Sequence, residues 1–205
     1  MDKHTIVPAR ISGDREDFRN LYIMSAPEYI PALFGGTQDK VTKSLFRYGR
    51  NLFSFEHTLF AQVNGKNAGM LLGYDWRTQK KESDKTSMLM VRYMKTKFIT
   101  QIQHLAWASS VLTKIDDGTF YISNLAVYPE YRRNGLGTSL LSHAEQAAIK
   151  LGAKSLELDV EADNENAIRL YRKFGMNIIG EPKGTVIDGE EFEFFRMTKN
   201  ISPQP

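Results

Sequence analysis

Two glycines that stand two positions apart give the clearest chemical signal in this sequence. Gly135 and Gly137 lie in the run from Arg132 to Thr138, between a β-favouring run that ends at Val127 and a helical pattern of apolar residues. The first N–H groups of a helix lack intrahelical partners, and the helix dipole favours negative charge, so a backbone at this junction can bind an anion. Glycine lets the backbone come close because it carries no Cβ. The sequence therefore predicts a phosphate-binding loop.

The loop differs from two familiar phosphate-binding patterns. A P-loop needs a lysine directly after its last glycine, and none follows Gly137. A dinucleotide fingerprint needs a third glycine where this chain has Leu140. The pattern that fits is Arg/Gln-x-x-Gly-x-Gly/Ala, beginning at Arg132. With it the chain resembles the GCN5-related N-acetyltransferases (GNAT family), in which this loop binds the pyrophosphate of acetyl-coenzyme A.

A second stretch strengthens the resemblance. Residues Asn164 to Met176 are similar to the family's Asn-x-x-Ala-x-x-Leu-Tyr-x-x-x-Gly-Phe. Both motifs occur in the family's order, with a strand-like run from Lys154 to Val160 between them. The resemblance is specific over Tyr121–Met176, looser to Thr198 and only topological before Tyr121.

The resemblance implies a single N-acetyltransferase domain over residues 1–205 of the α/β (α+β) class. Its core would be a mixed, mostly antiparallel twisted sheet of about seven strands flanked by helices. The residues themselves predict a first strand, helices from Ser12 onward, a hairpin, a polar surface loop, a helical insertion between the third and fourth strands, and a C-terminal tail. The strand is expected at Thr5–Ile11, a first helix capped within Ser12–Asp14 and running through Phe18, Leu21 and Tyr22, and a second helix at Asp39–Tyr48. The hairpin joins His57–Val63 to Ala68–Trp76, the loop is Arg77–Lys85, and the insertion is Thr86–Ile115. Late strands are expected at Met176–Gly180 and from Phe192, and the tail is Ile201–Pro205.

The resemblance also assigns the site. Tyr171 would be the general acid that protonates the CoA sulfur, although a helix tyrosine can equally hold its hydroxyl in solvent. Asn164 would contact the CoA arm, but it could be a plain helix cap. Arg132 would contact the ligand rather than lie exposed beside a helix start. The residues expected to bind the cofactor are Leu125, Ala126, Val127, Arg132, Arg133, Asn134, Gly135, Leu136, Gly137, Thr138 and Asn164.

The general base is left open. In the histone-acetylating branch of the family a glutamate lies eleven positions before the first residue of the loop motif, and Tyr121 occupies that place here. The alternatives are a carboxylate or a water relayed through two polar residues of the fourth strand. The candidates are Glu161, Asp75, Glu56 and the pair Ser123 and Asn124.

The acceptor side carries no motif. Aromatic residues near the N-terminus could line an acceptor site, although core packing is the favoured interpretation for each; they are Tyr22, Tyr29, Phe34, Phe46 and Tyr48. The apolar stripe of the insertion could pack in the core, line a pocket or form a dimer contact. Its Met90, Met94, Phe98 and Trp107 would suit a partly apolar pocket for a small amine.

The composition argues against several classes of protein. The chain has 205 residues, no cysteine and a formal net charge of +3, so neither a disulfide framework nor a thiolate site is available. No apolar run is long enough for a transmembrane helix and no signal peptide begins the sequence, so a cytoplasmic protein without membrane contact is expected. The four histidines show no metal spacing, and no metal is expected. The pI of 9.0 alone suggests nucleic acid, but no basic stripe interleaved with aromatic residues supports that partner.

The expected function is transfer of an acetyl group from acetyl-CoA to a primary amine, with a small molecule favoured over a protein. Two alternatives are a non-catalytic acyl-CoA sensor and a protein or peptide N-acetyltransferase. A sensor has no need of an acid beside the sulfur, so Tyr171 favours the enzyme. The expected partners are acetyl-CoA and the amine acceptor, with a homodimer possible.

Overall fold

A continuous sheet of seven strands organises the computed structural model, which describes residues 4–112 and 114–201. The strand order is β1-β2-β3-β4-β5-β7-β6. The strands are β1 His4–Pro8, β2 Thr58–Val63, β3 Lys66–Asp75, β4 Thr119–Val127, β5 Ser155–Glu161, β6 Asn177–Ile187 and β7 Glu190–Asn200. β4 and β5 run parallel, and the other neighbouring pairs run antiparallel. The predicted mixed, mostly antiparallel sheet is confirmed.

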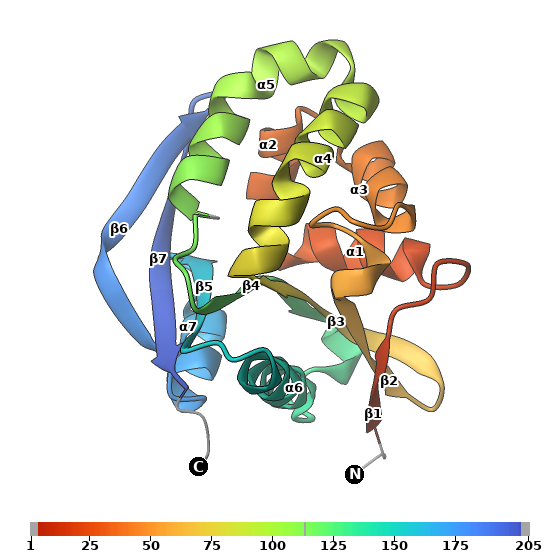
Figure 1. The fold of residues 1–205 in the computed structure, drawn as a ribbon, viewed down its shortest axis with the longest axis vertical. Helices are drawn as coiled ribbons and strands as arrows, with labels where there is room; N and C mark the ends of the chain where they lie inside the picture. Colours follow the sequence, from red (N-terminus) through yellow and green to blue (C-terminus); the bar gives the residue numbers. More distant parts are fainter. Residues whose placement is uncertain (1–3, 113, 202–205) are drawn as a thin grey trace.

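Helices cover both faces of the sheet (Figure 1). One face carries α6 Leu136–Lys150 and α7 Glu165–Lys173, and the other carries α1 Arg15–Ser25, α2 Tyr29–Phe34, α3 Gln38–Arg47, α4 Trp76–Met94 and α5 Thr96–Trp107. Strand alternation divides the core between the faces: Phe60 and Met70 pack with the N-terminal helices, whereas Ala61 and Leu71 pack under α6.

The predicted hairpin forms between β2 and β3. Its turn is Asn64-Gly65, and both residues have positive φ angles, 50° and 76°. A two-residue turn of this kind matches the right-handed twist of the flanking strands. Gly69 sits in β3 where a Cβ would come within 3.0 Å of the Ala126 carbonyl oxygen, so β3 approaches β4 closely there.

The predicted surface loop Arg77–Lys85 is wrong, because these residues form the first half of α4. The carboxylate of Asp75 caps the helix by accepting a hydrogen bond from the Thr78 N–H at 2.9 Å. Most of the charged residues that suggested a loop are good helix formers with exposed side chains, whereas Glu82 is buried. The helical insertion between β3 and β4 is confirmed, but it begins at Trp76 and breaks at Lys95, which has a φ of 55°. After α5, a π-helical turn spans Ala108–Leu112.

Smaller differences concern the number of helices and the ends of some elements. Three helices rather than two fill the segment between β1 and β2, because Pro31 lies in the first turn of α2, where its missing N–H costs nothing. β1 ends at Pro8, and β6 continues well past Gly180. Of the predicted tail, only Ile201 lies within the described residues.

Candidate active site

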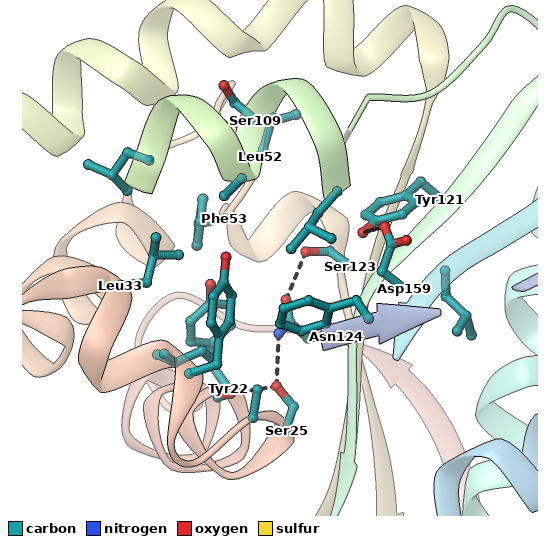
Figure 2. Close-up of a pocket in the computed structure, with 18 of the residues that line it drawn as sticks. Tyr22, Ser25, Leu33, Leu52, Phe53, Ser109, Tyr121, Ser123, Asn124 and Asp159 are labelled. Atoms are coloured by element: carbon teal, nitrogen blue, oxygen red, sulfur yellow. Dashed lines mark hydrogen bonds between the residues drawn. The ribbon is translucent and has the colours of Figure 1, made fainter. Parts of the chain in front are cut away.

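The sheet opens between its two parallel strands. The pairing of β4 with β5 covers Thr119–Ile122 against Ser155–Leu158. Beyond it, β4 continues beside β3 and β5 continues beside β7, so their ends diverge. A cavity of about 580 Å³ lies at this opening, lined from both strands, α7, the α1–α2 region and the insertion (Figure 2). Such a switch point is a common place for a ligand site.

The glycine loop presents its backbone to solvent at the start of α6. Gly135 has a φ of 79°, a conformation that L-residues adopt with strain. The first backbone hydrogen bond of the helix joins the Ser139 N–H to the Gly135 carbonyl at 3.0 Å. Within residues 4–112 and 114–201, no acceptor engages the N–H groups from Arg133 to Thr138. These exposed donors at a helix N-terminus fit an anionic ligand.

Three loop residues have structural roles that their sequence context did not reveal. Arg132 donates from Nε to the Val127 carbonyl at 3.0 Å and so ties the loop to β4. The side chain of Leu136 is buried in the core, which leaves only its backbone for a ligand. A Cβ on Gly137 would lie 3.0 Å from Leu170 Cδ2, so this glycine lets α6 pack against α7. Asn134 and Thr138 are exposed.

Tyr171 projects from α7 into the cavity. Its side chain is buried as a whole and lines the cavity. Its hydroxyl makes no hydrogen bond with any residue of the described part of the chain. Burial raises the pKa of Tyr171 to about 12, which keeps the hydroxyl protonated and available as a donor. Asn164 lines the same cavity while its Oδ1 caps α7 by accepting from the Ala167 N–H at 3.2 Å, so its capping role and a ligand contact are compatible.

The four candidate bases differ in whether they line the cavity. Asp75 is occupied as the α4 cap, and Glu56 accepts the Arg50 N–H at 2.6 Å; neither lines the cavity. Glu161 does line it, at the end of β5. Burial, with added repulsion from Asp163 and Glu28, raises the pKa of Glu161 to about 7. A carboxylate with this pKa can accept protons near neutral pH.

The relay candidates also lie in the cavity wall. Ser123 donates to the Asn124 Oδ1 at 2.8 Å, and Asn124 donates from Nδ2 to the Ser25 Oγ at 2.8 Å (Figure 2). Ser25 in turn donates to the Tyr22 carbonyl at 2.6 Å. This chain connects β4 with the end of α1, so Glu161 and the Ser123–Asn124 pair remain as candidates for proton removal.

One polar cluster beside the cavity was missed in the sequence. Arg196 of β7 donates from Nε and from NH2 to the two oxygens of Asp159, each at 2.8 Å. Asp159 also accepts the Tyr121 hydroxyl at 2.9 Å. The same guanidinium reaches the carbonyls of Leu112 and Lys114, so it fastens the end of the insertion to the sheet. The sequence did carry one signal of this cluster. Three acidic residues alternate along β5 and so share one face of the sheet, where a basic partner on a neighbouring strand could be expected.

Part of the insertion and of the N-terminal aromatic set lines the cavity. Met90, Phe98, Tyr22, Tyr29 and Phe34 do so. The others do not: Met94 and Phe46 are fully buried in the core, Trp107 packs against Phe194 at 6.4 Å between ring centroids, and Tyr48 shares a hydrogen bond with Tyr93. Of the three β4 residues expected to contact the CoA arm, Leu125 lines the cavity.

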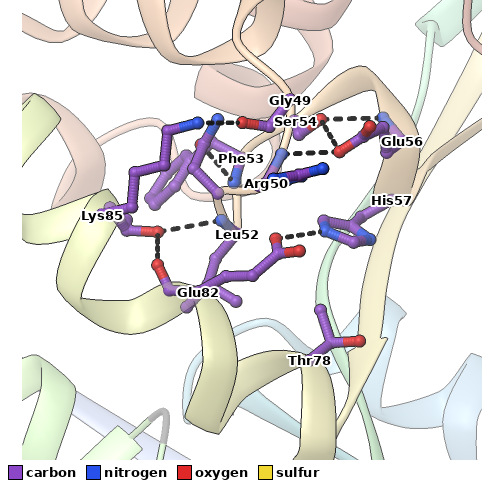
Figure 3. Close-up of polar contacts among 12 residues, drawn as sticks. Gly49, Arg50, Leu52, Phe53, Ser54, Glu56, His57, Thr78, Glu82 and Lys85 are labelled. Carbon is purple, nitrogen blue, oxygen red and sulfur yellow. Dashed lines mark hydrogen bonds and ion pairs between the residues drawn. The ribbon is translucent and has the colours of Figure 1, made fainter.

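A second polar cluster supports the cavity wall (Figure 3). His57 shares a hydrogen bond with Glu82 at 2.8 Å, and Glu56 lies beside them with metal-like spacing. These groups are held by protein partners, and two further bonds join the same loop to α4: Lys85 to the Gly49 carbonyl and the Leu52 N–H to Thr86. The cluster thereby holds Leu52 and its neighbour Phe53 in the cavity wall.

Among the described helices, none is long and apolar enough to cross a membrane.

Comparison with known proteins agrees with this geometry. The model of the Acetyltransferase (GNAT) family matches residues 18–176. An N-acetyltransferase from Staphylococcus aureus Mu50 superposes with a TM-score of 0.68 at 18% identity, covering 95% of this chain and 100% of that one. A GNAT family acetyltransferase from Elizabethkingia anophelis, solved with acetyl-CoA bound, gives a TM-score of 0.55 at 17% identity over 98% of this chain and 100% of that one. At these identities the two structures show the fold.

Curated relatives share a shorter stretch. The [ribosomal protein bS18]-alanine N-acetyltransferase of Escherichia coli K12 is 38% identical over 79 residues, 38% of this chain and 52% of that protein. A putative enzyme of the same name from Bacillus subtilis is 36% identical over 88 residues, 43% of this chain and 57% of that protein. The chain thus spans about half the length of these relatives. Because the family model covers most of its residues, the chain belongs to the GNAT family of acetyltransferases and is an acyltransferase.

Proposed function

We propose that this acyltransferase moves the acetyl group of acetyl-CoA to the primary amine of a small acceptor, with Tyr171 as general acid. The observation that carries the proposal is the cavity at the β4–β5 opening. Tyr171, whose hydroxyl is unpartnered in the described structure, and Glu161 both line this cavity next to the start of α7.

The CoA side of the site would begin at the glycine loop. The exposed N–H groups from Arg133 to Thr138 would bind the pyrophosphate. Residues Leu125 to Val127 pair with β3 along one edge, while the described part of β5 has already diverged from their other edge. That edge can hydrogen-bond the pantetheine arm and offer an N–H to the thioester oxygen. A pre-placed donor of this kind lowers a barrier by about 3 kcal/mol.

The reaction follows from these positions. The neutral amine attacks the thioester carbonyl carbon, and the C–S bond breaks as the amide C–N bond forms. Tyr171 gives its proton to the departing sulfur. The proton released by the amine passes to Glu161, or through the Ser123–Asn124 pair, and from there to solvent or back to Tyr171. Atoms and charges therefore balance without a further reactant.

The insertion supports a small acceptor, because α4 and α5 contribute one wall of the cavity and leave limited room for a folded protein. A second candidate is a peptide N-terminus, which the names of the curated relatives favour. Acetyl transfer measured with purified protein on a panel of small amines and on alanine-initiated peptides separates the two. Efficient acetylation of the peptides with no small amine accepted would overturn the small-amine proposal.

The loop's role has a direct test in Gly135→Ala. A Cβ at this position meets no heavy atom within 4 Å, so it would project into the space where a phosphate would lie. We expect CoA affinity, measured by calorimetry, to fall at least about tenfold, or about 1.4 kcal/mol. The matched control is Gly189→Ala in the β6–β7 turn, which has a similar φ of 87° and the same open surroundings. Equal CoA affinity in both variants would contradict the proposed loop contact.

A further inference from the structure

The cavity is polarised between its two sides. Its sheet side carries polar groups, among them Tyr171, Glu161, Ser123 and Asn124. The side formed by α2 and α5 is largely apolar and includes Ile30, Leu33, Phe98 and Leu105, whereas α4 adds Met90 together with the polar Gln79, Ser83, Thr86 and Ser87. A molecule that fills this space meets hydrogen-bonding groups at the sheet and hydrocarbon along α2 and α5.

The charge of the cavity is nearly balanced. Asp159 is neutralised by the paired hydrogen bonds of Arg196. Glu161 makes no ion pair with any residue that the structure describes. Lys114 also lines the cavity, but it is exposed and its charged end can stay in solvent. One uncompensated carboxylate suits one ammonium group, whereas a second ammonium on the same molecule would find no anion of its own.

Tyr29 lines the cavity and carries an unpartnered hydroxyl. Its side chain is 6% exposed, and its buried hydroxyl lacks a hydrogen-bond partner in the described structure. Edge-to-face contacts with Phe192 and Phe194, at 5.3 and 4.7 Å between centroids, fix the ring. Phe194 is also the register partner of Glu161 across β5 and β7, so the ring of Tyr29 lies beside the acidic end of the cavity. A buried hydroxyl without a partner is unfavourable unless a ligand supplies one.

Resting on the proposed function, we infer that the acceptor is a monoamine carried on an apolar aryl or alkyl body. Its ammonium lies between Glu161 and the hydroxyl of Tyr29, which accepts a hydrogen bond from it. The bound ammonium loses one proton to solvent before the neutral amine attacks, and the body of the acceptor lies against the apolar side formed by α2 and α5. The aromatic rings around the acidic end add a cation–π attraction for the same group. Tyr29 thereby becomes a specificity residue of the acceptor site.

The first test compares amines with the intact protein and acetyl-CoA, following release of the CoA thiol. We expect kcat/KM for 2-phenylethylamine and hexylamine to exceed that for spermidine by at least about tenfold. Preference for spermidine, or for an alanine-initiated peptide, would overturn the inference while leaving acetyl transfer established. Absence of CoA release with every amine, despite acetyl-CoA binding, would instead reject the proposed function.

The second test is Tyr29→Phe, which removes only the hydroxyl. We expect KM for 2-phenylethylamine to rise about tenfold while KM for acetyl-CoA stays unchanged, because a hydrogen bond to a charged group is lost. The melting temperature should stay the same or rise, since no protein partner loses a bond. Tyr93→Phe is the control: it removes a hydroxyl that bonds Tyr48 outside the cavity. An unchanged amine KM in Tyr29→Phe would overturn the assignment of Tyr29.

Discussion

Replacing Tyr171 by phenylalanine is expected to lower kcat for the best acceptor about 10²–10⁴-fold, the range that general acid catalysis supplies. The hydroxyl lies in the cavity without a described partner, so its removal breaks no protein hydrogen bond and leaves α7 packed. Because the pKa of Tyr171 is raised to about 12, the donor stays protonated across the working range. The loss should therefore be the same at every pH between about 6 and 9.

Two measurements separate this role from a structural one. CoA affinity by calorimetry should be unchanged in Tyr171→Phe, since the hydroxyl acts on the leaving sulfur after binding. Tyr48→Phe removes a hydroxyl outside the cavity and should keep the wild-type kcat. If Tyr171→Phe keeps most of the wild-type rate, then water or another group protonates the sulfur.

The parts of this molecule that follow from local sequence were predictable. The Asn64-Gly65 turn, the junction at Gly135 and the cap at Asn164 each depend on residues within a few positions, and each is present. The helical periodicity of its residues also placed the insertion between the third and fourth strands, where the structure has it. Even so, the local pattern failed at Arg77–Lys85, because a solvated helix and a polar loop have similar composition.

Features made by distant residues could not be predicted. Arg196 and Asp159 are neighbours only because β7 inserts beside β5 in the sheet. Gly137 looked like a ligand residue, but the closest constraint on it comes from Leu170 on another helix. The acceptor side was equally hidden, since Tyr29 and Phe98 meet around the cavity from segments that are far apart in the sequence.

The second large expected effect is on the pH dependence of kcat/KM, which we expect Glu161 to determine. Its pKa is raised to about 7, so the carboxylate is a competent base above that pH and is protonated below it. For the wild type, kcat/KM expressed per neutral amine should fall about tenfold per unit as the pH drops below about 7. In Glu161→Gln we expect kcat/KM at pH 8 to fall about 10²-fold or more, and the limb near pH 7 to disappear.

Asp163→Asn shows whether that limb belongs to Glu161. Asp163 is exposed, and its negative charge is one of the causes that raise the pKa of Glu161. Neutralising it should lower that pKa and move the limb to lower pH, while kcat/KM at pH 8 stays close to the wild-type value. A limb that persists at pH 7 in Glu161→Gln would show that it belongs to another titrating group, whereas a wild-type rate without the limb would leave proton transfer to the Ser123–Asn124 pair. A limb that Asp163→Asn leaves in place would likewise point to a titrating group other than Glu161.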